Sequence, residues 1–183
     1  KVQKVEIAEM RAEAASAKVL SPPAVTNWQD VTNLLRESVR TKKGFTVDSA
    51  GVFRAPGASI GDTMVMRPGE KDRAVRVRYV GQTQVSLWIK GGDSSAYVLA
   101  ARDRVMIKRQ LQKYGEAESM VPSVVHPVGF DPMQPHELIV TVRGAVVSVW
   151  LDGRYIAAAE ETALKECSIA IVPMASCTVQ KVE

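Results

Sequence analysis

Hydrophobic and polar residues alternate along several stretches of this chain. Residues 74–80, Ala-Val-Arg-Val-Arg-Tyr-Val, show the pattern most clearly, and residues 84–90 and 146–151 repeat it. A period of two is typical of a β-strand with one buried and one exposed face, because successive side chains point to opposite sides. The pattern therefore predicts strands that each carry an aliphatic face and a polar face.

Shorter apolar runs, with turn residues about every 8–12 positions, extend this prediction over the rest of the chain. They cover residues 45–47, 52–54, 63–67, 96–100, 105–108, 138–142, 155–159, 168–172 and 178–182. The pair Asp152-Gly153 is a strong signal for a two-residue hairpin. Because no crossover helix separates the strands, neighbouring strands are expected to be antiparallel. The predicted fold class is all-β, an antiparallel β-sandwich.

The start of the chain differs from this pattern. Residues 7–18 are rich in helix formers but have a weak apolar stripe, which predicts a linker helix. The tripeptide Ser-Pro-Pro at residues 21–23 marks a boundary, and a short helix with one apolar side is expected at residues 28–40. We therefore divide the chain into an N-terminal strand and linker, residues 1–24, and a β-sandwich domain, residues 25–183.

One segment within the predicted sandwich has no strand pattern. Residues 114–135 contain four prolines and two glycines, so we expect a long loop there. His126 and His136 each adjoin a proline at this loop and are expected to be solvated.

The pentapeptide Val-Gln-Lys-Val-Glu occurs twice, at residues 2–6 and 179–183. Two copies separated by the length of a domain are typical of a tandem array, in which the first copy is the last strand of a preceding, similar domain. Alternatively, both copies are related edge strands of one sheet. The first interpretation is favoured, and with it the expectation that this chain is a piece of a longer modular protein.

Composition supports the β prediction and excludes several classes of protein. The chain has 27 Val and only 9 Leu, and β-branched Val suits a pleated, half-buried surface. The net charge of +4 is well mixed, without the clustered basic stripe of a nucleic-acid binder. No apolar run approaches the roughly 20 residues that a membrane span needs, so no membrane insertion is expected. An extracytoplasmic or cell-surface location is slightly favoured.

The two cysteines, Cys167 and Cys177, fall on the two predicted closing strands. A turn centred near Val172 would bring them together as a disulfide, whereas a turn near Met174 would put them out of register. Both alternatives stay open, with two partly buried thiols favoured.

The last third of the chain resembles the closing hairpins of concanavalin A-like, laminin-G-type jelly rolls. Residues 136–144, His-Glu-Leu-Ile-Val-Thr-Val-Arg-Gly, lead into Val-Ser-Val-Trp-Leu-Asp-Gly at residues 147–153, which is similar to that family's pattern. Cys-Ser-Ile-Ala-Ile, residues 167–171, stands where the family has Gly-x-Ile-Gly-Leu, with both glycines replaced. The resemblance implies a fold that hosts lectins, glycosidases and protein-binding modules.

Candidate catalytic chemistry is sparse. Retaining glycosidases of this fold carry Glu-x-Asp-x-x-Glu or Glu-x-Asp-x-Glu on one strand, and no such run occurs here. The sequence has no His-Glu-x-x-His motif, no Cys-x-x-Cys and no Gly-x-Ser-x-Gly elbow. We therefore expect no catalytic residues, no metal site and no cofactor, and a carbohydrate-active hydrolase is the least favoured function.

The polar faces of the alternating strands hold the candidate ligand-binding residues. They are Arg76, Arg78, Trp88, Lys90 and Trp150. An aromatic ring beside arginine and serine side chains suits a sugar or a peptide, because the ring stacks on an apolar patch while polar groups fix its orientation. In the alternative interpretation the tryptophans cover the sheet under the linker or the long loop, and the arginines form a solvated row.

The function predicted from these features is a non-catalytic binding module for a carbohydrate or protein ligand. The alternative is a structural repeat or assembly unit whose sheet edges contact neighbouring copies of the same domain.

Overall fold

The computed structural model describes Pro22, Trp28 and residues 46–47, 53–54, 64–65, 72–89, 95–110, 116–161, 167–173 and 178–183. Every regular element in these residues is a β-strand. The predicted helices at residues 7–18 and 28–40 lie outside them, apart from Trp28 itself, and so does the first pentapeptide copy at residues 2–6.

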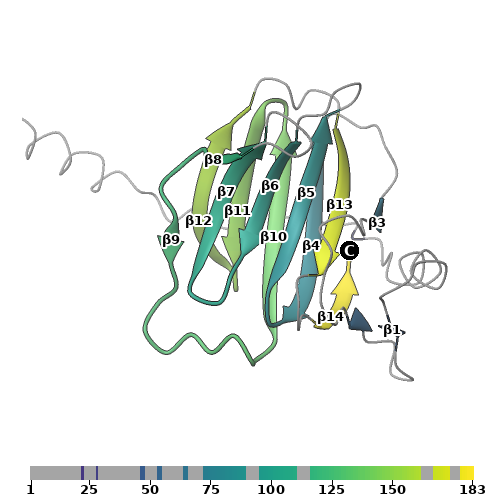
Figure 1. The fold of residues 1–183 in the computed structure, drawn as a ribbon, viewed down its shortest axis with the longest axis vertical. Coiled ribbons are helices and arrows are strands. Elements are labelled where there is room, and N and C mark those ends of the chain that lie inside the picture. Colours follow the sequence, from purple (N-terminus) through teal and green to yellow (C-terminus); the bar gives the residue numbers. More distant parts are fainter. Residues whose placement is uncertain are drawn as a thin grey trace, which may run out of the picture.

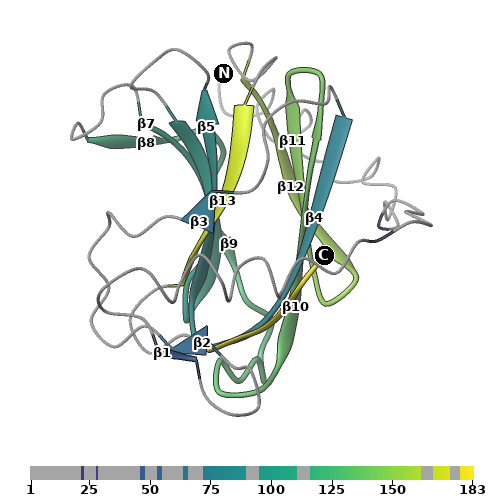
Figure 2. The same ribbon diagram turned by 90° about the vertical axis from the view of Figure 1, so that its right-hand side faces the viewer.

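The strands form two sheets that face one another, as Figures 1 and 2 show. The first sheet contains, in spatial order, β1 (Thr46–Val47), β2 (Phe53–Arg54), β14 (Thr178–Val182), β4 (Asp72–Val80), β10 (His136–Arg143), β11 (Val146–Leu151) and β12 (Arg154–Glu160). The second contains β3 (Met64–Val65), β13 (Cys167–Pro173), β5 (Thr83–Ile89), β6 (Ser95–Ala100), β7 (Arg104–Gln110) and β8 (Ala117–Ser119), while β9 (Val124–Val125) pairs with β7. All the paired strands are antiparallel, which confirms the predicted sandwich.

The core lies between the sheets and is built from the aliphatic faces that alternation predicted. On β4 the inward residues are Val75, Val77 and Tyr79, all fully buried. The other strands contribute Val85, Ala96, Val98, Ala100, Val105, Ile107, Leu138, Val140, Val142, Val147, Val149, Leu151 and Ala159. Removing this apolar surface from water is the main contribution to folding.

The chain crosses between the sheets several times, and these crossings bring distant segments together. After β4 it turns at Gly81, whose φ of 95° suits glycine, and enters β5 of the second sheet. As a result β4 has no sequence neighbour beside it and lies between β14 and β10 instead. The polar residues that face outward on these three strands therefore form one surface.

The hairpin between β11 and β12 has the turn that the sequence predicted. Asp152 and Gly153 have φ values of 50° and 77°, and positive φ at both central residues is what a two-residue type I′ hairpin turn requires. The tight turn fixes the direction of the Asp152 side chain, which matters for the site described below.

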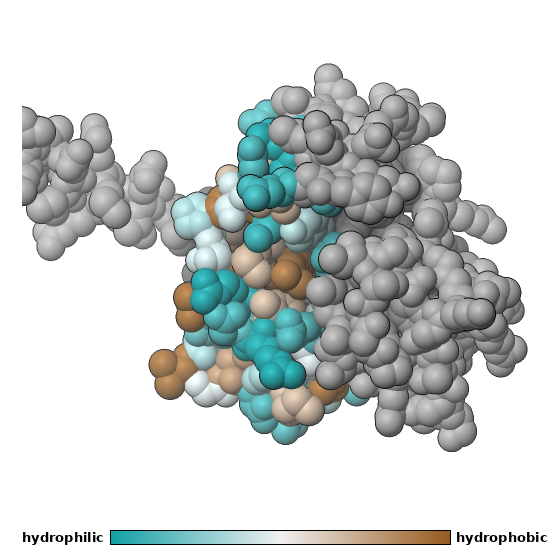
Figure 3. All heavy atoms as spheres, in the orientation of Figure 1, coloured by the Kyte–Doolittle hydropathy of each residue, from teal (hydrophilic) through white to brown (hydrophobic). Residues whose placement is uncertain are grey.

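The prediction of one long loop at residues 114–135 is wrong in part, because β8 and β9 lie within these residues and pair with β7. Between β9 and β10 the loop is held by stacked rings: the Phe130 ring centroid lies 3.7 Å from that of His126 and 4.0 Å from that of His136. The exposed apolar side chains of the protein include those of Val125, Val128 and Met133. Figure 3, which has the orientation of Figure 1, shows apolar residues on the surface in the region of β9 and this loop.

Candidate ligand-binding site

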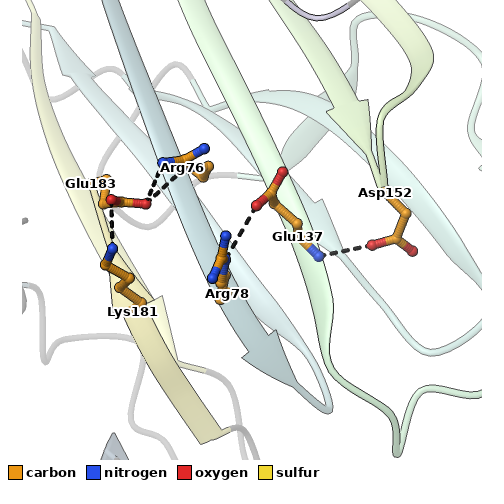
Figure 4. A network of polar contacts seen from close by, with 6 residues as sticks. All are labelled: Arg76, Arg78, Glu137, Asp152, Lys181 and Glu183. Atoms are coloured by element: carbon orange, nitrogen blue, oxygen red, sulfur yellow. Dashed lines mark hydrogen bonds and ion pairs between the residues drawn. The ribbon is translucent and has the colours of Figure 1, made fainter. Parts of the chain in front are cut away.

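A row of charged side chains crosses the outer face of the first sheet (Figure 4). It runs from β14 across β4 to β10 and consists of Lys181, Glu183, Arg76, Arg78 and Glu137. Cross-strand register explains the row, because Lys181 lies opposite Arg78, and Arg78 lies opposite Glu137. Two carboxylates among three cations relieve the repulsion that like charges on paired strands would otherwise cause.

Arg76 is the arginine of this row that pairs with Glu183, and its side chain is 21% exposed. Its Nε and Nη2 atoms both donate to Oε2 of Glu183, at 2.8 and 2.6 Å. Its guanidinium also lies over the Trp28 ring, with Cζ 4.4 Å from the ring centroid, which is a cation–π contact. Arg76 therefore links β4 to Glu183 and to Trp28, and most of its side chain is buried by these contacts.

Glu183 shows how strongly the charges are coupled. Its side chain is 8% exposed, and burial alone would raise the pKa of its carboxyl group. Hydrogen bonds from Lys181 and Arg76, together with their positive charges, outweigh that effect and hold the pKa below its ordinary value. Glu183 is therefore an ionised carboxylate at neutral pH and a fixed counter-ion for both cations.

Arg78 differs from Arg76 because its side chain is 50% exposed. Its Nε atom donates to Oε2 of Glu137 at 3.2 Å, across the β4–β10 pair. The guanidinium is thus oriented by one carboxylate but keeps donors that face solvent.

Asp152, in the turn after β11, is held by two neighbouring groups. Its Oδ1 accepts from the backbone N–H of Glu137 at 2.8 Å, and its Oδ2 lies 2.8 Å from Nδ1 of His136. The other ring nitrogen of His136 lies 2.8 Å from the carbonyl oxygen of Asp131. The expectation that His136 is solvated is wrong: it is 9% exposed because it stacks on Phe130 and begins β10.

These groups surround a hollow of about 350 Å³ at one end of the first sheet. It is lined by Arg78, Pro135, His136, Glu137, Asp152 and Gln180, and we call it the polar hollow. Its volume is within the range of small-molecule sites, and its lining has both donors and acceptors. Within the described residues, no three His, Cys, Asp or Glu side chains cluster so that they would hold a metal ion.

The structure brings some of the predicted ligand-binding residues together and separates others. Arg78 lines the polar hollow, and Arg76 lies beside it on β4 but is paired with Glu183. Trp150 faces outward on β11 but is only 6% exposed and packs edge-on against Tyr155, with ring centroids 5.7 Å apart. Trp88 belongs to β5 of the second sheet, and Lys90 lies outside the described residues, so their roles stay predictions.

Five residues of the polar hollow were not singled out as ligand-binding from the sequence: Pro135, His136, Glu137, Asp152 and Gln180. Asp152 was recognised only as a turn residue and His136 only as a loop histidine. Gln180 had a usable signal, since it belongs to the duplicated pentapeptide, but its position beside Arg78 depends on β14 pairing with β4.

Solved structures of similar shape identify the fold. The carbohydrate binding module CBM66 from Bacillus subtilis superposes with a TM-score of 0.56 at 13% identity, covering 87% of this chain and 95% of that one. Sheep galectin-11, solved in complex with glycerol, gives 0.50 at 13% identity, covering 70% and 97% of the two chains. The laminarinase catalytic domain from Thermotoga maritima gives 0.54 at 11% identity, covering 78% and 80%. No protein-family model and no curated protein sequence matches the chain.

The chain has a concanavalin A-like jelly-roll fold. This confirms the resemblance of the closing hairpins, where β10 and β11 carry the family-like segments. At identities this low, the similarity of this jelly roll to its neighbours shows the fold alone. The neighbours themselves differ in function, since one is a binding module and another is a catalytic domain. The function therefore has to be argued from the polar hollow. Within the described part of this jelly roll, no helix has the length and apolar character to cross a membrane.

Proposed function

We propose that this chain is a non-catalytic module that binds a carbohydrate in the polar hollow. The observation that carries the proposal is the arrangement of Arg78, Glu137 and Asp152. The Arg78 and Asp152 side chains are about half exposed, yet each is oriented by a partner within the protein. A sugar presents hydroxyl groups that both donate and accept, and this set of guanidinium and carboxylate groups complements them.

Preorganisation strengthens the proposal. Immobilising a flexible side chain on binding costs about 0.5–1.5 kcal/mol, so groups that are already fixed bind at lower cost. The Arg78–Glu137 ion pair and the two hydrogen bonds of Asp152 fix these side chains before any ligand arrives. The backbone of a β-sheet and a two-residue turn support them, which limits movement further.

The sequence favours binding over hydrolysis by the carboxylates of the polar hollow. Glu137 accepts from Arg78, and Asp152 accepts from the Glu137 amide and faces Nδ1 of His136. A glycoside hydrolase needs a carboxyl group that carries a proton and donates it to the leaving oxygen. The chain has no Glu-x-Asp-x-x-Glu or Glu-x-Asp-x-Glu run of the kind that retaining hydrolases of this fold carry, and for this reason we favour a lectin-like role.

We place this module in a larger modular protein with an extracytoplasmic or cell-surface location, where glycan ligands are available. The duplicated pentapeptide supports the modular context. A bacterial carbohydrate binding module has the same fold, so the fold is compatible with a glycan ligand, while the choice of a glycan over a protein rests on the polar hollow.

The test starts from a printed array of neutral and acidic oligosaccharides, followed by calorimetry with the strongest binder. Arg78→Ala should weaken that binding about 10- to 100-fold, because a hydrogen bond to a charged group contributes about 1.5–3 kcal/mol. Arg143→Ala is the matched control: it removes an exposed arginine from the far end of β10 and should leave the affinity unchanged.

Two results would contradict this proposal. The first is that the protein binds no oligosaccharide on the array, which would favour a protein ligand or a structural role. The second is an equal loss of affinity in Arg78→Ala and Arg143→Ala, because it would show a diffuse effect of net charge rather than a contact in the polar hollow.

A further inference from the structure

The exposed charges of the polar hollow limit the class of sugar that it accepts. Among the described residues that line it, Arg78 is the one side chain with a permanent positive charge, and this side chain is 50% exposed. Glu137 and Asp152, with side chains 30% and 46% exposed, each contribute a carboxylate. A ligand in the polar hollow therefore meets one guanidinium and two carboxylates.

His136 adds no positive charge that a ligand can use. It is 9% exposed, and its Nδ1 and Nε2 atoms each lie 2.8 Å from a protein oxygen, Oδ2 of Asp152 and the carbonyl oxygen of Asp131. Both ring nitrogens therefore face acceptors within the protein. A second proton on the ring would at most balance the charge of Asp152, so the lining has no net positive charge in either state of the ring.

The cations beside the polar hollow are bound within the protein. Lys181 lies opposite Arg78 on β14, but it is not among the residues that line the hollow, and its Nζ donates to Glu183 at 2.6 Å. Arg76 donates to the same carboxylate, as Figure 4 shows. Arg78 itself donates from Nε to Glu137, so its terminal N–H groups are the ones that remain for a ligand.

A negatively charged sugar would bring a third anion into this space. It would pair with Arg78 inside the same hollow as Glu137 and Asp152, so that two repulsions oppose one attraction. Salt does not remove these repulsions, because a hollow of about 350 Å³ is comparable in width to the Debye length of about 8 Å at physiological ionic strength. An uncharged sugar avoids them, and its hydroxyl groups both accept from a guanidinium and donate to carboxylates.

We propose that the polar hollow is selective for uncharged sugar units, and that Glu137 is the residue that excludes acidic ones, such as uronic acids and sulfated sugars. This inference rests on the proposed binding of a carbohydrate in the polar hollow and adds the class of that ligand. Glu137 has this role because it holds Arg78: an acidic group that approaches the guanidinium also approaches the carboxylate bound to its Nε. Gln180, exposed on β14, adds an uncharged amide that donates and accepts, as hydroxyl groups require.

Matched oligosaccharides on one array test this selectivity. Each neutral oligosaccharide is printed beside two derivatives, one with its C6 hydroxyl groups oxidised to carboxylates and one with the corresponding carboxamides, which have nearly the same shape without the charge. The protein should bind the neutral form about tenfold or more better than the carboxylate. The carboxamide should recover most of that loss. Calorimetry with the neutral form should show little change when salt is raised from about 0.05 to 0.5 M, because its binding forms no ion pair.

Glu137→Gln tests the residue itself. Glutamine keeps an acceptor for Arg78 but removes one of the two repulsions, so the preference for the neutral over the carboxylate form should fall by about three- to tenfold. Glu160→Gln is the matched control, because it removes the same charge from an exposed position at the other end of the β11–β12 hairpin from Asp152. It should leave the preference unchanged.

The outcomes distinguish a failure of this inference from a failure of the proposed function. Three results would overturn the selectivity while leaving the polar hollow as a glycan site. They are equal or stronger binding of the carboxylate form, a carboxamide that binds as weakly as the carboxylate, and the same preference in Glu137→Gln as in Glu160→Gln. If none of the three forms of any oligosaccharide binds, the proposed function fails and this inference fails with it.

Discussion

Replacing Leu138 with alanine should lower the free energy of unfolding by about 2–5 kcal/mol, the range for a buried leucine truncated in a well-packed core. Leu138 is fully buried on the inner face of β10, where it pairs with Val77 on β4 and Leu151 on β11. Truncation removes apolar contacts from both neighbours and leaves a cavity between the sheets. Equilibrium denaturation in urea measures the loss.

Leu99→Ala provides the matched control for this effect. Leu99 lies on β6, and it is only partly buried while its neighbours Val98 and Ala100 are core residues. The same truncation should therefore cost about 1 kcal/mol or less, in proportion to the smaller apolar area that it removes from a buried position. Equal losses for the two leucines would contradict the assignment of the β10 inner face to the centre of the core.

Asp152→Ala should have the second largest effect, a loss of about 2–4 kcal/mol in the free energy of unfolding together with weaker glycan binding. Its backbone φ of 50° is unfavourable for alanine by about 1 kcal/mol or more. The substitution also removes the partner of Nδ1 of the buried His136, and an unsatisfied buried donor costs about 1–3 kcal/mol. Urea denaturation and calorimetry measure the two effects separately.

Asp152→Asn distinguishes the contribution of the turn conformation from that of the carboxylate group. Asparagine tolerates the left-handed backbone and keeps one side-chain oxygen as an acceptor, so stability should fall by less than half as much as in the alanine variant. Glycan affinity should still fall, because one of the two acceptor oxygens is replaced by a donor. An asparagine variant as unstable as the alanine variant would show that both carboxylate oxygens are essential to the fold.

The fold was predictable to the extent that local pattern determines it. Strand β11 has the predicted bounds, and Asp152-Gly153 forms the predicted turn, because both depend on residues adjacent in sequence. Strands β8 and β9 were missed, since they are only three and two residues long and lie in a proline-rich segment without an alternating pattern. The predicted boundary between residues 24 and 25 lies outside the described residues and stays a prediction. Cys177 also lies outside them, so the two alternatives for Cys167 and Cys177, a disulfide or the favoured pair of thiols, stay open.

The candidate site was less predictable for the same reason. Alternation along β4 showed correctly that Arg76 and Arg78 face away from the core, but it gave no information on the neighbouring strands. Glu183 and Glu137 come from strands far away in sequence, and they decide that Arg76 is neutralised while Arg78 keeps solvent-facing donors. A tryptophan on β5 and an arginine on β4 look equivalent in sequence, yet they belong to different sheets.

The most direct test of the account is to map the glycan on the protein by NMR. The isotope-labelled chain is titrated with the oligosaccharide that binds most strongly on the array, and backbone amide shifts are followed residue by residue. Binding in the polar hollow should move the amide signals of Arg78, Glu137 and Asp152, while those of β5 around Trp88 stay in place. Shifts centred on Trp88, with Glu137 and Asp152 unchanged, would contradict the account and place the ligand on the second sheet.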